Sequence, residues 1–140
     1  MHTTHTLSHT DAQHAITAIS GELVKRGKAG VIAVTDEHGE LIALLRMDGA
    51  PLPSITIAIN KAFTAAREAK PTLDIGAKFR EKGYDFAWYG DVRYVGWGGG
   101  VPILLEGGAC IGGVAVSGLS QQEDHELATL GARLVIHPER

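Results

Sequence analysis

The chain has little cysteine and no excess of basic residues. Cys110 is the single cysteine among 140 residues, which excludes an internal disulfide and any metal site built from several cysteines. Because Cys110 lies in an apolar segment, we expect a packed thiol. Lys and Arg total 13 against 16 Asp and Glu, a net charge of −3. A chain without a basic stripe is not expected to bind nucleic acid.

Long apolar runs and recognisable signals are also missing. A membrane-spanning helix needs about 20 apolar residues, and no run approaches that length, so no membrane partner is expected. The first residues lack a secretory signal, so we expect a cytoplasmic protein. His9 and His14 are five apart and do not share a helix face, and the histidines as a whole predict no metal site. The glycines near Gly96 precede a strand rather than a helix, which excludes a dinucleotide fingerprint.

Glycine is concentrated in one stretch, residues 96–118, which holds nine of the 18 glycines. The pair Gly107-Gly108 separates the apolar runs Val101–Leu105 and Ala109–Val116, which predicts a tight β-hairpin. Glycine has no side chain, so another group can come close to the backbone of this stretch. That group is a ligand, a helix or another subunit.

The remaining pattern predicts helices around a second hairpin. Ser8 with Asp11 forms a capping box, Ser54 and Thr72 cap the middle helices, and Ser120 with Glu123 caps the last. The order predicts one domain over 1–140, of α+β class, with an antiparallel sheet covered by helices. We expect a flexible leader over 1–7, helices over 8–27, 54–70, 72–83 and 120–137, strands over 31–36 and 40–47, and a short edge strand over 93–97.

Two positions carry candidate chemistry. Lys61 is the one charge in the apolar stretch INKAFTAA. It is either a surface lysine or structural partner of Asp48, or a buried cation that orients a carboxylate or carbonyl ligand. A buried lysine has a lowered pKa and could act as a base or a Schiff-base amine. His125, beside Asp124, is either a helix-surface histidine or a general base or haem ligand at a pocket rim.

Aromatic residues cluster between residues 84 and 97, which hold both tryptophans and all three tyrosines. Such a cluster usually caps a core or fills an interface. The alternative is stacking on a flat ligand, with Trp97 as a wall of the pocket.

Three ordered motifs resemble the GlcG/HbpS family of small haem-binding or haem-degrading-type proteins, which also includes a domain of PduO-type corrinoid adenosyltransferases. They are RMDGA followed by S…KA.TA, then GG-V-P-I, then G..IGG..VSG…D..LA..G, and together they cover about residues 12–131. The resemblance implies a profilin-like α-β-α domain with an antiparallel sheet of about five strands. It also implies homo-oligomers from dimer to octamer, haem as a cofactor in some members, and catabolic gene clusters.

Site residues follow from the same motifs. The resemblance places Arg46, Asp48, Ser54, Lys61, Thr64, Gly99, Gly100, Pro102, Gly112, Ser117, Gly118 and Asp124 at family positions. We expect ligand contacts from Arg46, Met47, Thr64, Trp97, Gly99, Gly100, Pro102 and Ser117. The family's axial haem ligand varies, and Thr64, His9, His14, Met47 and Cys110 are the candidates here.

Three functions are compatible with these residues. The first is a binding protein for haem or a similar planar molecule, held between the glycine-rich hairpin and the helix over 54–70. The second is an enzyme of isomerase, lyase or hydrolase type acting on a small carboxylated or carbonyl metabolite. Lys61, Asp48 and either Asp124 or His125 would then be its catalytic residues. The third is a structural subunit whose glycines serve assembly.

Overall fold

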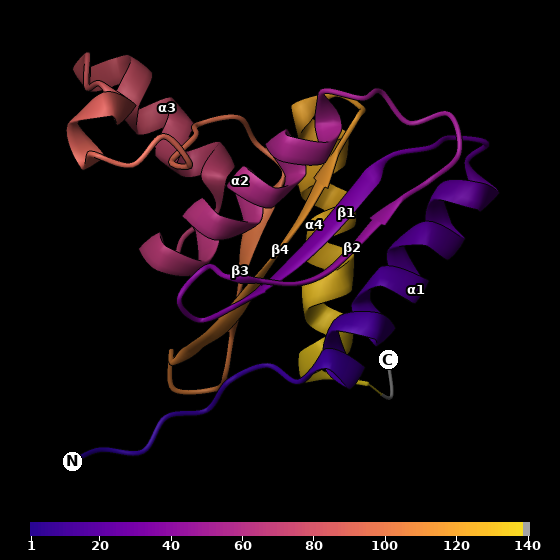
Figure 1. Ribbon diagram of the computed structural model, residues 1–140, viewed down its shortest axis with the longest axis horizontal. Coiled ribbons are helices and arrows are strands. Elements are labelled where there is room, and N and C mark those ends of the chain that lie inside the picture. The colour runs from indigo at the N-terminus through magenta and orange to yellow at the C-terminus, as the bar shows by residue number, and fades with distance from the viewer. Residues whose placement is uncertain (139–140) are drawn as a thin grey trace.

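A computed structural model describes residues 1–138 and shows four helices, a short 3-10 helix and four strands within them (Figure 1). The elements, in chain order, are α1 (His9–Lys25), β1 (Val31–Asp36), β2 (Leu41–Arg46), α2 (Ser54–Glu68), α3 (Thr72–Lys82), η1 (Phe86–Tyr89), β3 (Gly100–Leu104), β4 (Cys110–Ser117) and α4 (Gln121–Ile136). Among these described residues, no helix combines the length and the apolar character that crossing a membrane requires.

The strands form one antiparallel sheet in the order β2-β1-β4-β3. Both hairpins expected from the sequence are present, and β1 joins them by pairing with β4 from Val31 opposite Ser117 to Asp36 opposite Gly112. The hairpin turn at Gly107-Gly108 is confirmed, since both residues have positive φ angles near +96°. The central strand β1 is buried over its first five residues, as an apolar run covered on both faces predicts.

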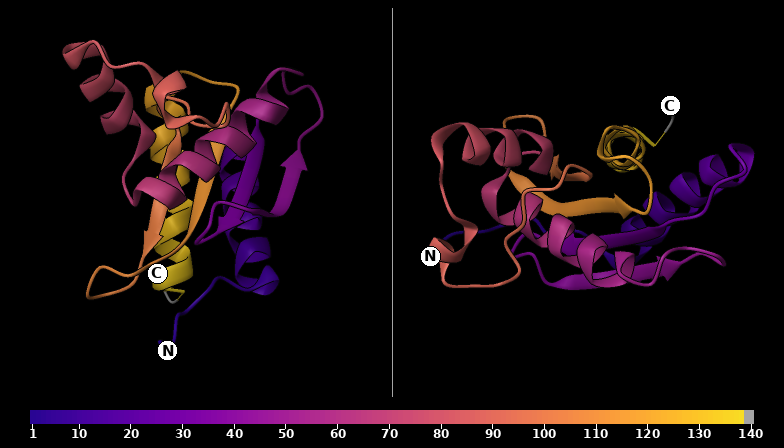
Figure 2. Two further views of the ribbon diagram at one scale, coloured as in Figure 1. Left: turned by 60° about the vertical axis from the view of Figure 1, so that its left-hand side comes forward. Right: turned by 90° about the horizontal axis from the view of Figure 1, so that it is seen from above.

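Helices cover both faces of the sheet. α1 and α4 pack on one face and α2 packs on the other, which the view from above shows (Figure 2). The core on the first face includes Ile19, Leu23, Ile32 and Leu127. The core under α2 is built from small residues, with Ala58 and Ala62 against Ala33 and Ala115, so this helix lies close to the sheet. The α+β class and the three-layer arrangement are therefore confirmed.

The expectation of about five strands is wrong for the described residues, because the segment 93–97 forms no strand. Its backbone is held by a side chain instead. Thr64 Oγ1 lies 3.2 Å from the Arg93 carbonyl and accepts a 3.0 Å hydrogen bond from the Val95 N–H. These contacts use backbone groups that a sheet ladder would otherwise need.

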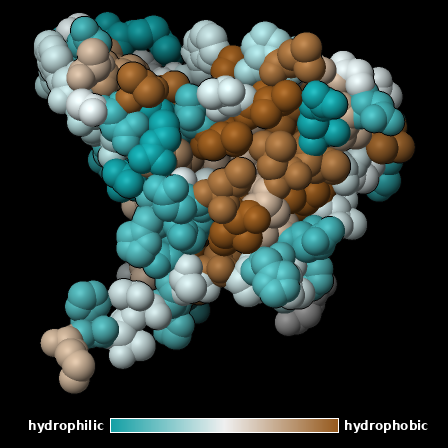
Figure 3. All heavy atoms as spheres, viewed as in Figure 1, coloured by the Kyte–Doolittle hydropathy of each residue, from teal (hydrophilic) through white to brown (hydrophobic). Residues whose placement is uncertain are grey.

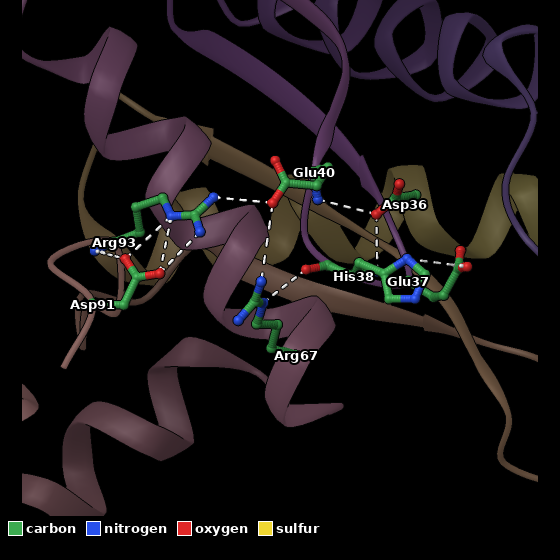
Figure 4. A network of polar contacts seen from close by, with 7 residues as sticks. All are labelled: Asp36, Glu37, His38, Glu40, Arg67, Asp91 and Arg93. Carbon is green, nitrogen blue, oxygen red and sulfur yellow. Dashed lines mark hydrogen bonds and ion pairs between the residues drawn. The ribbon is translucent and has the colours of Figure 1, made fainter. Parts of the chain in front are cut away.

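A polar network fixes the start of the same segment (Figure 4). Arg93 pairs with Asp91 at 2.9 Å and with Glu40 at 3.1 Å, and its guanidinium lies 4.0 Å from the centre of the Phe63 ring. Arg67 donates a 2.7 Å hydrogen bond to the His38 carbonyl. Residues 91–95 are thereby anchored both to the β1–β2 turn and to α2.

Helix capping follows the sequence at two of four positions. Ser8 and Asp11 form the expected capping box, and Ser120 accepts a 3.2 Å hydrogen bond from the Glu123 N–H. The expected caps at Ser54 and Thr72 are wrong, because the prolines before them occupy the N-cap positions. Both hydroxyls are left for other roles. That of Thr72 accepts a 2.9 Å hydrogen bond from the Gly100 N–H.

The amino-terminal segment meets the fold one residue earlier than expected. Leu7 is buried, and its N–H donates a 3.1 Å hydrogen bond to the Ile111 carbonyl. Leu7 therefore belongs to the packed domain rather than to the leader expected over 1–7.

Candidate functional site

Lys61 and Asp124 form a buried ion pair between α2 and α4. The Lys61 Nζ donates to Asp124 Oδ2 at 3.0 Å and to the Val116 carbonyl at 3.1 Å, and only 3% of the lysine is exposed. The other carboxylate oxygen, Oδ1, accepts a 3.2 Å hydrogen bond from the Leu119 N–H. The partner of Lys61 is thus Asp124, 63 residues away in the chain, and the expected pairing with Asp48 is wrong.

Burial controls the electrostatics of this pair. Loss of solvation lowers the pKa of the Lys61 ammonium, and the charge of Asp124 opposes that shift. Burial likewise raises the pKa of the Asp124 carboxyl, against the effect of Lys61. Gly99, with a φ of +127°, lies against the pair: a Cβ at this position would come within 2.8 Å of both Lys61 Nζ and Asp124 Cβ. The glycine is therefore required for close packing.

A cavity of about 650 Å³ opens beside Lys61, and we call it the Lys61 cavity. Its lining comes from the start of α2, the end of β4, the start of α4, and two residues from α3 and the segment before β3. The polar lining residues are Ser54, Lys61, Arg80, Ser117 and Gln121, and the others are Pro51, Trp97, Gly118 and Leu119. Lys61, Trp97 and Ser117, which the sequence proposed for a site, therefore meet here.

Three other expected site residues lie elsewhere. Arg46, Met47 and Asp48 line a shallow depression beside Val24, near the end of α1. Asp48 is exposed and does not line the Lys61 cavity. The catalytic group expected from the sequence is therefore not assembled as a unit: Lys61 and Asp124 meet, Asp48 is separate, and His125 lines a different pocket.

That second pocket, which we call the His125 groove, lies between β3, α4 and the α2–α3 connection. It has a volume of about 440 Å³ and is mainly apolar, and its lining includes Pro71, Val101, Pro102, Leu104, His125, Ala132, Arg133 and Ile136. His125 Nδ1 is buried and has no hydrogen-bond partner among residues 1–138. Because buried polar atoms are normally paired, this unpartnered nitrogen is an exception, and it belongs to a side chain that lines the groove.

The candidate axial haem ligands named from the sequence differ in burial and in their contacts. The Thr64 hydroxyl is fully buried and engaged with three backbone groups, so it cannot reach a ligand. Cys110 is half-buried with Sγ 3.4 Å from the Ala66 carbonyl, and burial raises the pKa of its thiol, as a packed cysteine requires. His9 and His14 lie exposed on α1, and none of these side chains lines either pocket.

Sequence reasoning missed Arg80, Gln121 and Arg133. Each is one of several polar residues on its helix, so no local signal distinguished it. Gly100, in contrast, was expected to contact a ligand and instead packs against the Lys61 backbone, held by Thr72.

The turn between β1 and β2 gathers three side chains with metal-binding atoms. Asp36, Glu37 and His38 each bring one such atom to within 4.8 Å of the others (Figure 4). Asp36 Oδ1 already accepts hydrogen bonds from the N–H groups of His38 and Glu40. The cluster is therefore accounted for by the structure of the turn.

Relatives of known sequence extend over most of the chain. The model of the family described as "Haem degrading protein HbpS-like" matches residues 7–133. A 15.0 kDa protein from the dhaT-dhaS intergenic region of Citrobacter freundii is 31% identical over 129 residues, which cover 88% of this chain and 87% of the relative. A UPF0303 protein of Paraburkholderia xenovorans is 32% identical over 103 residues, 70% of this chain and 62% of the relative.

Solved structures agree with this match. Klebsiella pneumoniae protein ORFY superposes with a TM-score of 0.87 at 26% identity, over 96% of this chain and 94% of that one. HbpS gives a TM-score of 0.86 at 27% identity, over 96% and 93%. A PduOC:heme complex gives 0.80 at 26% identity, over 91% and 93%. From its sequence match and its fold, the chain belongs to the HbpS-like family.

Proposed function

We propose that the chain binds haem or a similar planar molecule, and that the His125 groove is the binding site. The observation that supports it most is the buried, unpartnered His125 Nδ1 beside an apolar groove of about 440 Å³. Pockets of a few hundred cubic ångströms with apolar walls and few polar groups suit such ligands. Relatives named for haem, including the PduOC:heme complex, support the same ligand class.

The residues of the groove fit such a ligand. The walls formed by Val101, Pro102 and Ile136 exclude water from an apolar ring. Imidazole is a common axial ligand of haem iron, and the His125 ring has no competing partner for Nδ1 within the described fold. Arg133, at the exposed side of α4, can pair with a carboxylate substituent. Bound haem would supply a redox-active iron centre.

A haemin titration tests this site. The unmodified protein should give a saturable Soret shift at one haem per chain. His125→Ala should weaken binding by at least about tenfold, because even the loss of a group that only orients a metal ligand typically costs about that much. His14→Ala, which removes an exposed histidine of α1, is the matched control and should bind as the parent does. Unchanged binding by His125→Ala would contradict the assignment.

The homo-oligomer implied by the family is part of the same proposal. β2 is an edge strand of the sheet, and an apolar band covers it and the adjacent side of α2 (Figure 3). The half-buried side chains Leu44, Ile55 and Ile59 contribute to this surface, and Leu52 is exposed beside them. An unpaired apolar edge is a template for another strand. We assign this surface to a second copy of the chain.

A further inference from the structure

The Lys61 cavity has the features of a second binding site. Three polar side chains of its lining are more than nine-tenths buried: Lys61 is 3% exposed, Ser117 4% and Ser54 5%. Pro53 holds the cap position that Ser54 would otherwise serve, so the Ser54 hydroxyl is not used as a helix cap. Both serines line the cavity, and a hydroxyl can donate a hydrogen bond to a group that enters it.

The charge of these groups favours an anion. Asp124 and the Val116 carbonyl account for two of the three protons on Lys61 Nζ, which leaves one donor. Arg80 adds a guanidinium, and both α2 and α4 begin at the cavity, at Ser54 and Gln121, with the positive ends of their dipoles. No acidic residue lies among the described residues that line the cavity, and the carboxylate of Asp124 is buried in its pair with Lys61.

The cavity lining also includes apolar residues. Trp97 is 58% exposed and lines the cavity together with Pro51 and Leu119. An indole face binds flat or apolar groups through contact area. A ligand that uses both kinds of lining residue carries an anionic group and an apolar body. Inorganic phosphate matches only the polar residues.

We propose that the Lys61 cavity binds a small organic carboxylate. The carboxylate is held by Lys61 Nζ and the hydroxyls of Ser54 and Ser117, and the body of the ligand lies against Trp97. Arg80 contributes attraction at the rim. This site is separate from the His125 groove, so its occupancy does not depend on haem.

Tryptophan fluorescence provides the test. In a Trp88→Phe chain, Trp97 is the sole tryptophan and reports on the cavity directly. The probes are benzoate, its neutral isostere benzamide, and inorganic phosphate. Benzoate should give saturable quenching and bind at least about tenfold more tightly than benzamide, because hydrogen bonds to charged groups are the stronger kind. Equal binding of benzoate and benzamide, or no saturable change with benzoate, overturns the proposal. Phosphate binding as tightly as benzoate overturns the role of Trp97.

Variants distinguish a loss of ligand binding in the cavity from a loss of folding. Substituting Ser54→Ala together with Ser117→Ala keeps the Lys61–Asp124 pair and should weaken benzoate binding at least about tenfold, since two hydrogen bonds are lost. Arg80→Gln, at an exposed position, should weaken it by a smaller factor. His14→Ala, in the Trp88→Phe background, is the control and should bind benzoate as the parent does, because His14 lies exposed on α1 and does not line the cavity. Unchanged affinity in the double serine variant overturns the site, whatever the haem titration shows.

Discussion

At the scale of single residues, the sequence indicated Lys61 but not its partner. A lysine inside INKAFTAA predicts either burial or a surface position, and the burial is found. Its counter-ion could not be predicted, because Asp124 is 63 residues away and Asp48 is an equally acidic candidate nearer in the chain. Only the packing of both α2 and α4 against β4 decides between them.

The ion pair makes a sharp prediction about stability. Lys61→Met leaves the Asp124 carboxylate buried without its counter-ion and should lower the free energy of unfolding by about 3–5 kcal/mol. Replacing both residues, Lys61→Met with Asp124→Leu, should recover most of that loss. Urea denaturation measures each value. Lys28→Met, which breaks an exposed pair with Glu123, is the control and should cost less than about 1 kcal/mol. A similar loss in the single and double Lys61 variants would refute the account.

At the scale of elements, apolar spacing and glycine positions predicted all four helices and both hairpins within a few residues. The errors concern two helix caps and one strand. Prolines occupy cap positions that the pattern assigned to hydroxyl residues, and a side chain binds the backbone of a segment that the pattern assigned to the sheet. Pro53 and Pro71 displaced Ser54 and Thr72 from the caps, and this freed the Ser54 hydroxyl for the Lys61 cavity. The segment 93–97 has the composition of a strand, but Thr64 binds its backbone.

The role of Thr64 can be measured. Thr64→Val keeps the shape of the side chain and removes the hydroxyl, so the free energy of unfolding should fall by about 1–3 kcal/mol. The Val95 amide should exchange faster in a hydrogen-exchange experiment, because its acceptor is lost. Thr129→Val is the matched control, since its hydroxyl bonds only to the His125 carbonyl one turn earlier. An effect of Thr64→Val no larger than that of the control would contradict this role.

At the scale of the whole molecule, two hairpins indicated an antiparallel sheet, but they did not fix the order of its strands. Pairing of β1 with β4 places β2 and β3 at the edges, and this order creates both an apolar edge at β2 and the His125 groove beside β3. Pairing between strands that are distant in the chain depends on which apolar surfaces fit together. The local spacing of apolar residues does not determine this.

The apolar surface at the β2 edge predicts that the chain forms a homo-oligomer. Ile59→Lys places a charge in the surface formed with Leu44 and Ile55, and it should shift the protein to a smaller species in analytical ultracentrifugation. The isolated fold should survive, because a half-buried lysine can extend its amine to solvent. Val92→Lys, at a position that is 94% exposed, is the control and should leave the mass unchanged. A parent protein that is already monomeric would refute the assigned surface.

Asp124 and His125 are consecutive residues of α4, yet one faces the Lys61 cavity region and the other the groove. Residues that follow each other in an α-helix are about 100° apart around its axis. The orientation of α4 about its own axis is therefore fixed by the contacts of both residues. Turning the helix to improve contacts in one pocket withdraws a side chain from the other. A one-residue insertion just before Asp124 would break the ion pair and reorient the imidazole in a single event.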